Sequence, residues 1–267
     1  MSKQISLLQR CLTPKAEIPP AWRIGAGMTV WLLVLAIWGI GSYGHYLPSI
    51  FMPTPGAVIG EAVTLTGNGT LLTDIWVSAE VVLVGFFLSS LFAIPLGLLM
   101  GSFRIVQAAL EPLVNFIRYL PVTSFVPLFI LWIGIDAESR IAVIIFGTFF
   151  QQIVMIADGV NAVPEDLLNA SYTLGASRRD VLFHVLAPAA WPSILNTLRV
   201  TMGWAWTYLV AAELVASSSG LGHLSIIAMR GFQVDKIFLA IAIIGLLGLI
   251  TDRAFALARR RFAAWAQ

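Results

Sequence analysis

The side chains that could take part in catalysis are few and scattered along this 267-residue chain. Its histidines, His45, His184 and His223, fall on separate segments, and no cluster has the short spacing of a metal site. The sequence contains no G-x-x-x-x-G-K-[ST] phosphate loop. An embedded enzyme would need His, Asp or Glu groups converging on one face, and only scattered acids are present. We therefore expect no metal or cofactor on this chain and no enzymatic activity of its own.

Several polar side chains lie inside long apolar segments, where such groups usually face a bundle interior or a cavity. Gln151 and Gln152 interrupt one segment near its middle, and either solute contact or hydrogen bonding between helices would account for them. Trp204 and Tyr208, at i, i+4 spacing, either wall a pore or pack as aromatics. The candidate residues of a solute pathway are Asn115, Tyr119, Thr123, Ser124, Gln151, Gln152, Trp204, Thr207, Tyr208 and Glu213.

Two acidic residues near segment ends also have structural interpretations. Instead of lining a pathway, Glu213 can cap a helix or pair with Arg230 or Arg140. Asp252, next to Arg253, is expected to form an ion pair at a membrane interface with no transport role.

The composition indicates a protein that lies largely in a lipid bilayer. Hydrophobic residues make up 58% of the chain and charged residues 11%, whereas soluble domains have about 45–50% and about 25%. The formal net charge of +2 is small, so nucleic acid is not an expected partner. The single cysteine, Cys11, excludes an intrachain disulfide.

Six apolar segments are long enough, or nearly so, to cross a hydrocarbon core of about 30 Å as helices. The third carries Pro121 and Pro127, which favours a kinked or broken helix. The first follows too many polar residues for a cleavable signal peptide, so it is expected to be retained. We expect an all-α, polytopic membrane protein with about six transmembrane helices, at Met28–Leu47, Ile75–Gly101, Tyr119–Ile135, Ile141–Ala157, Ser193–Val215 and Ile237–Leu257.

The basic residues predict the orientation, because loops rich in Lys and Arg stay cytoplasmic. Only Arg140, Arg230 and Lys236 fall on one side of the predicted spans, which also holds an extended connection at Pro48–Asp74. The other side collects Lys3, Arg10, Lys15, Arg23, Arg104, Arg118, Arg178, Arg179, Arg199, Arg253, Arg259, Arg260 and Arg261. The predicted parts are a cytoplasmic N-terminal segment 1–27, a transmembrane domain 28–257 and a cytoplasmic basic tail 258–267.

The connection 158–190, between the fourth and fifth spans, is amphipathic where a polar loop would be expected. Pro164, Glu165 and Asp166 favour a helix start, because proline suits an early position and acids suit the positive end of the helix dipole. Gly175 offers a turn that a side chain would obstruct. The sequence predicts two short cytoplasmic helices joined by a tight elbow, which either lie on lipid head groups or dock into a groove of a partner protein.

This connection resembles the EAA loop of bacterial ABC importer permeases, whose pattern is Glu-Ala-Ala, three residues, Gly, nine residues and Ile-x-Leu-Pro. The pattern falls without gaps on Asn169, Ala170, Ser171, Gly175, Val185, Ala187 and Pro188. Asn169, Ser171 and Ala187 depart from it, and the missing acid at 169 removes a charge from the expected contact. The resemblance implies that coupling to an ATPase rests on Glu165, Asp166, Asn169, Ala170, Ser171, Leu174, Gly175, Ala176 and Arg178.

The likeness extends over roughly residues 51–261. Four segments resemble the branch of these importers that takes up nitrate, taurine, alkanesulfonates and bicarbonate. They are Leu96–Gly101, Pro127–Gly134, Leu174–Arg178 and Ala211–Gly222. Arg118–Pro121 departs from the Arg-Pro-x-Pro usual in that branch, and acidic Glu80 stands where members often have a basic residue.

The resemblance implies a type I importer fold with cytoplasmic coupling helices, in which a second copy of the permease completes the pathway. A cytoplasmic ATPase would bind ATP and Mg²⁺, and a periplasmic or surface-tethered binding protein would deliver the solute to a bacterial inner membrane. A small anion is the expected substrate, with a neutral or aromatic metabolite as the alternative. A secondary transporter independent of ATP would be expected to have charged residues in the middle of its spans and two halves of similar sequence. The sequence has few charged residues in mid-span, and its halves do not resemble one another.

Overall fold

The computed structural model describes residues 13, 16, 19–44, 46 and 48–266. These residues form helices joined by turns, with no strand among them. Cys11 lies outside the described residues, as do the basic residues Lys3, Arg10 and Lys15. The chain divides into two compact units, Met1–Gly60 and Glu61–Gln267, which we describe separately.

The first unit contains α2 (Pro20–Tyr43) and the start of α3 (Pro55–Gly67). Helix α2 begins eight residues before the predicted Met28, because a proline at the first helical position suits a helix start. Most of its side chains are exposed. The long connection predicted at Pro48–Asp74 contains α3 and the first residues of the next helix.

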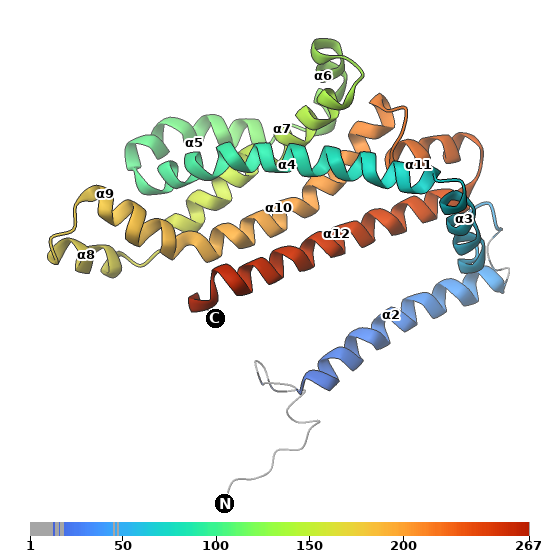
Figure 1. Ribbon diagram of the computed structural model, residues 1–267, viewed down its shortest axis with the longest axis horizontal. Helices are drawn as coiled ribbons and strands as arrows, with labels where there is room; N and C mark the ends of the chain where they lie inside the picture. Colours follow the sequence, from blue (N-terminus) through green and yellow to red (C-terminus); the bar gives the residue numbers. More distant parts are fainter. Residues whose placement is uncertain (1–12, 14–15, 17–18, 45, 47, 267) are drawn as a thin grey trace, which may run out of the picture. The chain divides into compact units, whose positions relative to one another are not determined.

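The second unit holds the rest of the chain (Figure 1). Its long helices pack in sequence, α4 on α7, α7 on α10 and α10 on α12. Its elements are α4 (Thr70–Ser102), α5 (Arg104–Arg118), η1 (Val122–Phe125), α6 (Val126–Ile133), α7 (Ala137–Asn161), α8 (Glu165–Thr173), α9 (Arg178–Asp180), the π-helix η2 (Val181–Leu186), α10 (Ala187–Ala216), α11 (Leu221–Arg230), α12 (Val234–Phe262) and η3 (Ala264–Ala266).

The described residues contain five helical stretches long and apolar enough to cross a membrane, and a bent pair that would make a sixth. The five are Ala21–Tyr43, Thr70–Ser102, Ala137–Asn161, Arg178–Val215 and Val234–Phe262. The prediction of an all-α chain with about six transmembrane helices is therefore confirmed.

The third predicted span, Tyr119–Ile135, has a different extent in the structure. The chain bends by 82° between Arg104–Arg118 and Val122–Ile133, so the broken span includes α5, which the sequence analysis treated as a loop. Pro121 stands in the break, where a proline and the residue before it both resist helical geometry. Arg118 consequently is the last residue of a helix, directly before the break, and does not lie in a loop.

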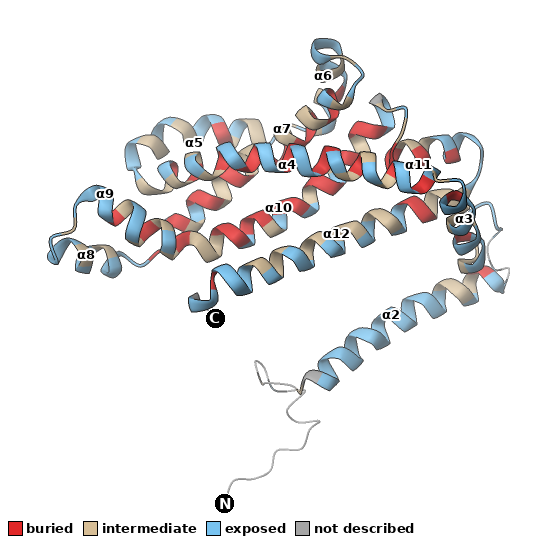
Figure 2. Cartoon of the chain, viewed as in Figure 1, coloured by how far each residue is buried: buried red, intermediate tan, exposed pale blue. Residues whose placement is uncertain are grey.

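Helices α4 and α7 approach closely because α4 places glycines at their contact. A Cβ at Gly97 would lie 2.7 Å from the Cβ of Ile156 and 3.0 Å from the carbonyl oxygen of Ile153. A Cβ at Gly101 would lie 2.8 Å from the carbonyl oxygen of Ala157. Small residues four apart are a common means of close helix contact in membranes. Buried side chains gather on α4, α7 and α10 (red in Figure 2), whereas α12 buries few.

We expect Gly97→Ala to destabilise the protein by roughly 1–3 kcal/mol, because the added methyl group forces α4 and α7 apart. Gly39→Ala is the matched control, since Gly39 lies inside α2 with open space around its Cβ position. There the higher helix propensity of alanine should leave stability unchanged or raise it. The measurement is the melting temperature of each purified variant in detergent. Equal melting temperatures would contradict the tight α4–α7 contact.

Candidate functional site

The connection between α7 and α10 forms a tight elbow. Helix α8 ends at Thr173, and Gly175 has a φ of +86°, a left-handed conformation that favours glycine. Ser177 and Asp180 then form a capping box at the start of α9, in which the N–H of each donates to the side chain of the other at 3.3 Å. The short helix α8 and the turn at Gly175 agree with the local structure that the sequence predicts. The second predicted short helix is instead the start of a continuous helical stretch, Arg178–Val215, which runs through η2 into α10.

The elbow is anchored on one side and exposed on the other. Val163, Val181 and Leu186 are buried in the core of the second unit. By contrast, the side chain of Leu174 at the tip is 87% exposed, and that of Tyr172 is 49% exposed. An exposed apolar tip on an anchored base is the form expected of a docking element.

The residues predicted to couple to an ATPase all lie on this elbow. Ser171 and Ala176 are partly buried, and the others are exposed: Glu165, Asp166, Asn169, Ala170, Leu174, Gly175 and Arg178. Their role in coupling stays a prediction.

A cavity of about 300 Å³ lies at the break between α5 and α6. It brings together three residues predicted to line a pathway, Thr123 from η1, Gln151 from α7 and Tyr208 from α10. Its lining residues are Ile117, Arg118, Leu120, Pro121, Val122, Thr123, Phe146, Gly147, Phe150, Gln151 and Tyr208.

Two further pathway candidates hold Arg118 at the edge of this cavity. The Nε of Arg118 donates to the Oδ1 of Asn115 at 2.9 Å, and its Nη2 donates to the hydroxyl of Tyr119 at 3.1 Å. The guanidinium carbon lies 4.6 Å from the centre of the Tyr119 ring, within the range of a cation–π interaction. Asn115 and Tyr119 therefore orient an arginine that the sequence analysis did not select.

Gln152 points elsewhere and joins helices. Its side chain is fully buried and hydrogen-bonds to Ser89 at 3.2 Å, Ser90 at 3.1 Å and Thr201 at 3.2 Å. These partners lie on α4 and α10, so Gln152 ties both helices to α7. Of the two interpretations open for Gln152, the structure shows the hydrogen bonding between helices.

The remaining pathway candidates on the break and on α10 lie apart from the cavity. Ser124 is exposed, and Trp204 is half-buried. Thr207 is exposed and lines a second, largely apolar groove of about 650 Å³ between α10 and α12, which Tyr208 and Thr123 also border.

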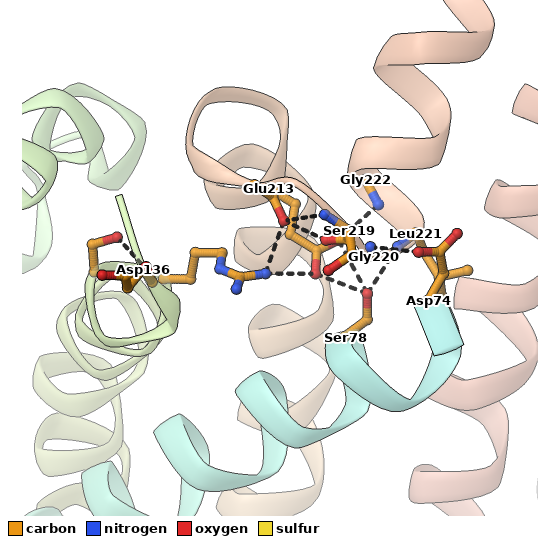
Figure 3. A network of polar contacts seen from close by, with 11 residues as sticks. Asp74, Ser78, Asp136, Glu213, Ser219, Gly220, Leu221 and Gly222 are labelled. Carbon is orange, nitrogen blue, oxygen red and sulfur yellow. Dashed lines mark hydrogen bonds and ion pairs between the residues drawn. The ribbon is translucent and has the colours of Figure 1, made fainter. Parts of the chain in front are cut away.

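Glu213 is fully buried near the end of α10, in a network of polar contacts (Figure 3). The Ser78 hydroxyl lies 2.8 and 3.0 Å from its two carboxylate oxygens, and the N–H of Gly222 donates to Oε2 at 2.7 Å. Ser78 in turn accepts a hydrogen bond from the N–H of Leu221 at 2.9 Å. Glu213 exposes no surface in this conformation, so its contact with a solute stays a prediction.

Arg140 and Asp74 extend this network to α7 and to the start of α4. The Nη1 of Arg140 lies 3.8 Å from Oε1 of Glu213 and donates to the Oγ of Ser217 at 2.9 Å. Asp74 accepts a hydrogen bond from the N–H of Gly220 at 2.8 Å. Of the two arginines considered as partners of Glu213, the structure therefore pairs it with Arg140.

Asp252 has a different partner from the predicted one. Its carboxylate accepts hydrogen bonds from the Nε of Arg199 at 2.5 Å and from Nη2 at 2.8 Å. The expected pairing with its neighbour Arg253 was wrong, because a bidentate bond to a guanidinium on α10 is geometrically better than a contact between adjacent residues.

Sequence reasoning missed several polar residues that organise the bundle. Ser78, Ser89 and Ser90 interrupt the apolar stretch of α4, and this interruption was a usable signal. Arg118 carried a weaker signal, as an arginine directly before the predicted third span, Tyr119–Ile135. Which helix each of them meets could not be read from spacing.

Comparison with known proteins agrees with this architecture. Residues 93–264, more than half of the chain, match the model of the family described as "Binding-protein-dependent transport system inner membrane component". The chain belongs to this family. Its membership favours a transport permease over the secondary transporter and the embedded enzyme that the sequence left as alternatives.

Relatives and a solved structure show which transporters within this family the chain is similar to. It is 40% identical over 243 residues to a probable ABC transporter permease of Brucella melitensis, covering 90% of this chain and 98% of the relative. It is 30% identical over 238 residues to the taurine transport permease TauC of Escherichia coli, covering 87% and 86%. The MetNI methionine ABC transporter in an inward-facing conformation shares the fold, with a TM-score of 0.66 at 19% identity over 72% of this chain and 96% of that one. The predicted resemblance to ABC importer permeases of the taurine type is confirmed.

We expect Glu213→Ala to destabilise the permease by about 3–5 kcal/mol, because it leaves Arg140 buried without its acidic partner. Glu138→Ala is the control, since Glu138 is exposed in the first turn of α7 and its loss should cost about 1 kcal/mol or less. Melting temperatures of both variants in detergent test this. If the two variants have equal melting temperatures, the network does not stabilise the end of the bundle.

Proposed function

We propose that this chain is the membrane-spanning permease subunit of an ATP-driven importer for a small anion. In this proposal two copies form the pathway, an ATPase bound on the cytoplasmic side hydrolyses ATP with Mg²⁺, and an external binding protein delivers the solute. Both termini face the cytoplasm of a bacterial inner membrane, as the distribution of Lys and Arg predicts. Family membership supports the permease assignment, and the exposed elbow carries the proposal of an ATPase partner.

The elbow supports docking because its apolar tip has no partner among the described residues of this chain. Leu174 and Tyr172 are exposed at the tip, while Val181 and Leu186 fix the base in the core. Since the base continues without a gap into α10, a partner that binds the elbow is connected to that helix. This is the mechanical connection that a transporter driven by a separate ATPase needs.

We expect Leu174→Glu to weaken the binding of the ATPase at least about tenfold and to abolish the hydrolysis of ATP stimulated by the loaded binding protein. Leu174 is 87% exposed, so a charge there should disturb a docked partner and leave the fold intact. The matched control is Phe103→Glu, at an exposed position between α4 and α5. Copurification of the ATPase and its hydrolysis rate in proteoliposomes are the measurements. Behaviour like wild type in Leu174→Glu would remove the elbow from coupling.

The proposed substrate class is supported by the relatives and by the cavity at the break between α5 and α6. The relative from Escherichia coli is named for taurine transport, and taurine carries a sulfonate group. The described part of this chain presents a guanidinium, that of Arg118, to the cavity. A small sulfonate or a similar anion therefore fits better than a neutral or aromatic metabolite.

We expect the cognate binding protein to melt at a higher temperature in the presence of taurine, an alkanesulfonate, nitrate or bicarbonate, because a ligand that binds only the folded state stabilises it. Uncharged metabolites of similar size are the control and should cause no shift. Stabilisation by uncharged metabolites alone would overturn the substrate class and leave the permease assignment standing.

A further inference from the structure

We propose that the cavity at the α5–α6 break is an anion-binding site of the permease itself, and that Arg118 binds the anionic group of a short organic anion there. This inference rests on the proposed function and adds to it a site on this chain, separate from the selection made by the binding protein. The cavity is lined by Arg118, Thr123, Gln151 and Tyr208.

Arg118 is placed and charged to bind an anion. Its side chain is half-buried, and no ion pair among the described residues includes it. A guanidinium has five N–H donors, and the hydrogen bonds to Asn115 and Tyr119 use two of them. The remaining donors are free for a ligand, and the two neighbours hold the planar group in place before a ligand arrives. An arginine held in this way suits bidentate binding of an oxyanion.

Three other polar side chains border the same space without a hydrogen bond to the described part of the chain. They are the hydroxyls of Thr123 and Tyr208 and the amide of Gln151. Gly147 lets the Tyr208 ring lie against α7, because a Cβ at that position would collide with the ring. Arg118 and these three groups come from four separate elements, α5, η1, α7 and α10, so the cavity gathers polar groups whose hydrogen-bonding capacity is still unused.

An arginine without an acidic partner beside a cavity in the middle of a spanning helix indicates a binding site. Gln151 lies close to the middle of α7, a helix long and apolar enough to span the membrane. A charged group at such a depth is costly, and it is usually retained where it serves a pathway or a binding site. Arg140, the one arginine that is buried among the described residues, has an acidic partner, whereas half-buried Arg118 has none.

The size and walls of the cavity indicate an organic anion with a short apolar stem. Its volume of about 300 Å³ corresponds to roughly ten water molecules in the liquid, which leaves room for a few heavy atoms and some water. Phe146 and Phe150, whose ring centroids are 5.5 Å apart in an edge-to-face arrangement, form an apolar part of the wall. A short alkanesulfonate would place its oxygens at Arg118 and its carbon atoms against these rings.

The test is direct binding of radiolabelled ethanesulfonate to the complex of permease and ATPase in nanodiscs, without the binding protein. We expect Arg118→Gln to weaken binding at least about tenfold. Arg118→Lys should bind with intermediate affinity, because it keeps the charge and loses the planar fork. Arg104→Gln is the matched control, since it removes an exposed arginine at the other end of the same helix, and it should bind like wild type. Size-exclusion profiles show that each variant is folded.

Competition experiments distinguish the contribution of the anionic group to binding from that of the apolar stem. Unlabelled ethanesulfonamide, similar in shape and uncharged at neutral pH, should not compete with ethanesulfonate. Competition by nitrate would assign recognition to the charge alone, and its absence would assign the stem to Phe146 and Phe150 as well; both outcomes support the site.

Three results would overturn the site: no binding by wild type, equal binding by Arg118→Gln, or equal competition by ethanesulfonamide. The same preparation separates these results from failure of the proposed function. If the ATPase copurifies and its hydrolysis responds to the loaded binding protein, only the site is lost. If no ATPase copurifies, the importer assignment is lost and the site with it.

Discussion

Backbone N–H groups that leave helical geometry in a buried turn need acceptors supplied by the protein, because an unpaired polar group shielded from water is costly. The turn between α10 and α11 shows how this requirement shapes the bundle. The N–H groups of Gly220, Leu221 and Gly222 donate to Asp74, Ser78 and Glu213, respectively. These acceptors lie on α4 and α10, so satisfying one turn fixes the relative positions of both helices. Gln152 does the same near the centre of α7, where it joins α4 and α10.

The break at Pro121 departs from this internal pairing. There the chain bends by 82°, and the side chains of Arg118, Thr123 and Gln151 border a cavity with donors still unused. A bundle that pairs its polar groups at both Gln152 and Glu213 has the means to pair these as well. The contrast between paired and unpaired groups is the physical basis for placing solute contact at the break.

Helix α10 connects the elbow, the cavity at the break and the polar network of Glu213. Its 30 residues extend over roughly 45 Å. The elbow joins it at one end through the π-helix Val181–Leu186, Tyr208 borders the cavity along its length, and Glu213 lies near its other end. The wider turn of a π-helix just before Pro188 gives this end of α10 a place to bend. One continuous helical stretch, Arg178–Val215, thus joins the elbow to the cavity.

The fold class, the number of spans and the turn at Gly175 could be predicted from the amino-acid sequence, because these depend on local properties: runs of apolar residues, proline and glycine at turns, and the spacing of a known motif. The sequence also selected Thr123, Gln151 and Tyr208 as polar or aromatic groups in spans. The packing of the helices was needed to show that they border one cavity, that Arg118 lies there, and that Asp252 binds Arg199 and not its neighbour. Hydropathy and periodicity describe one helix at a time, whereas a site between helices depends on how each helix is rotated and bent against the others.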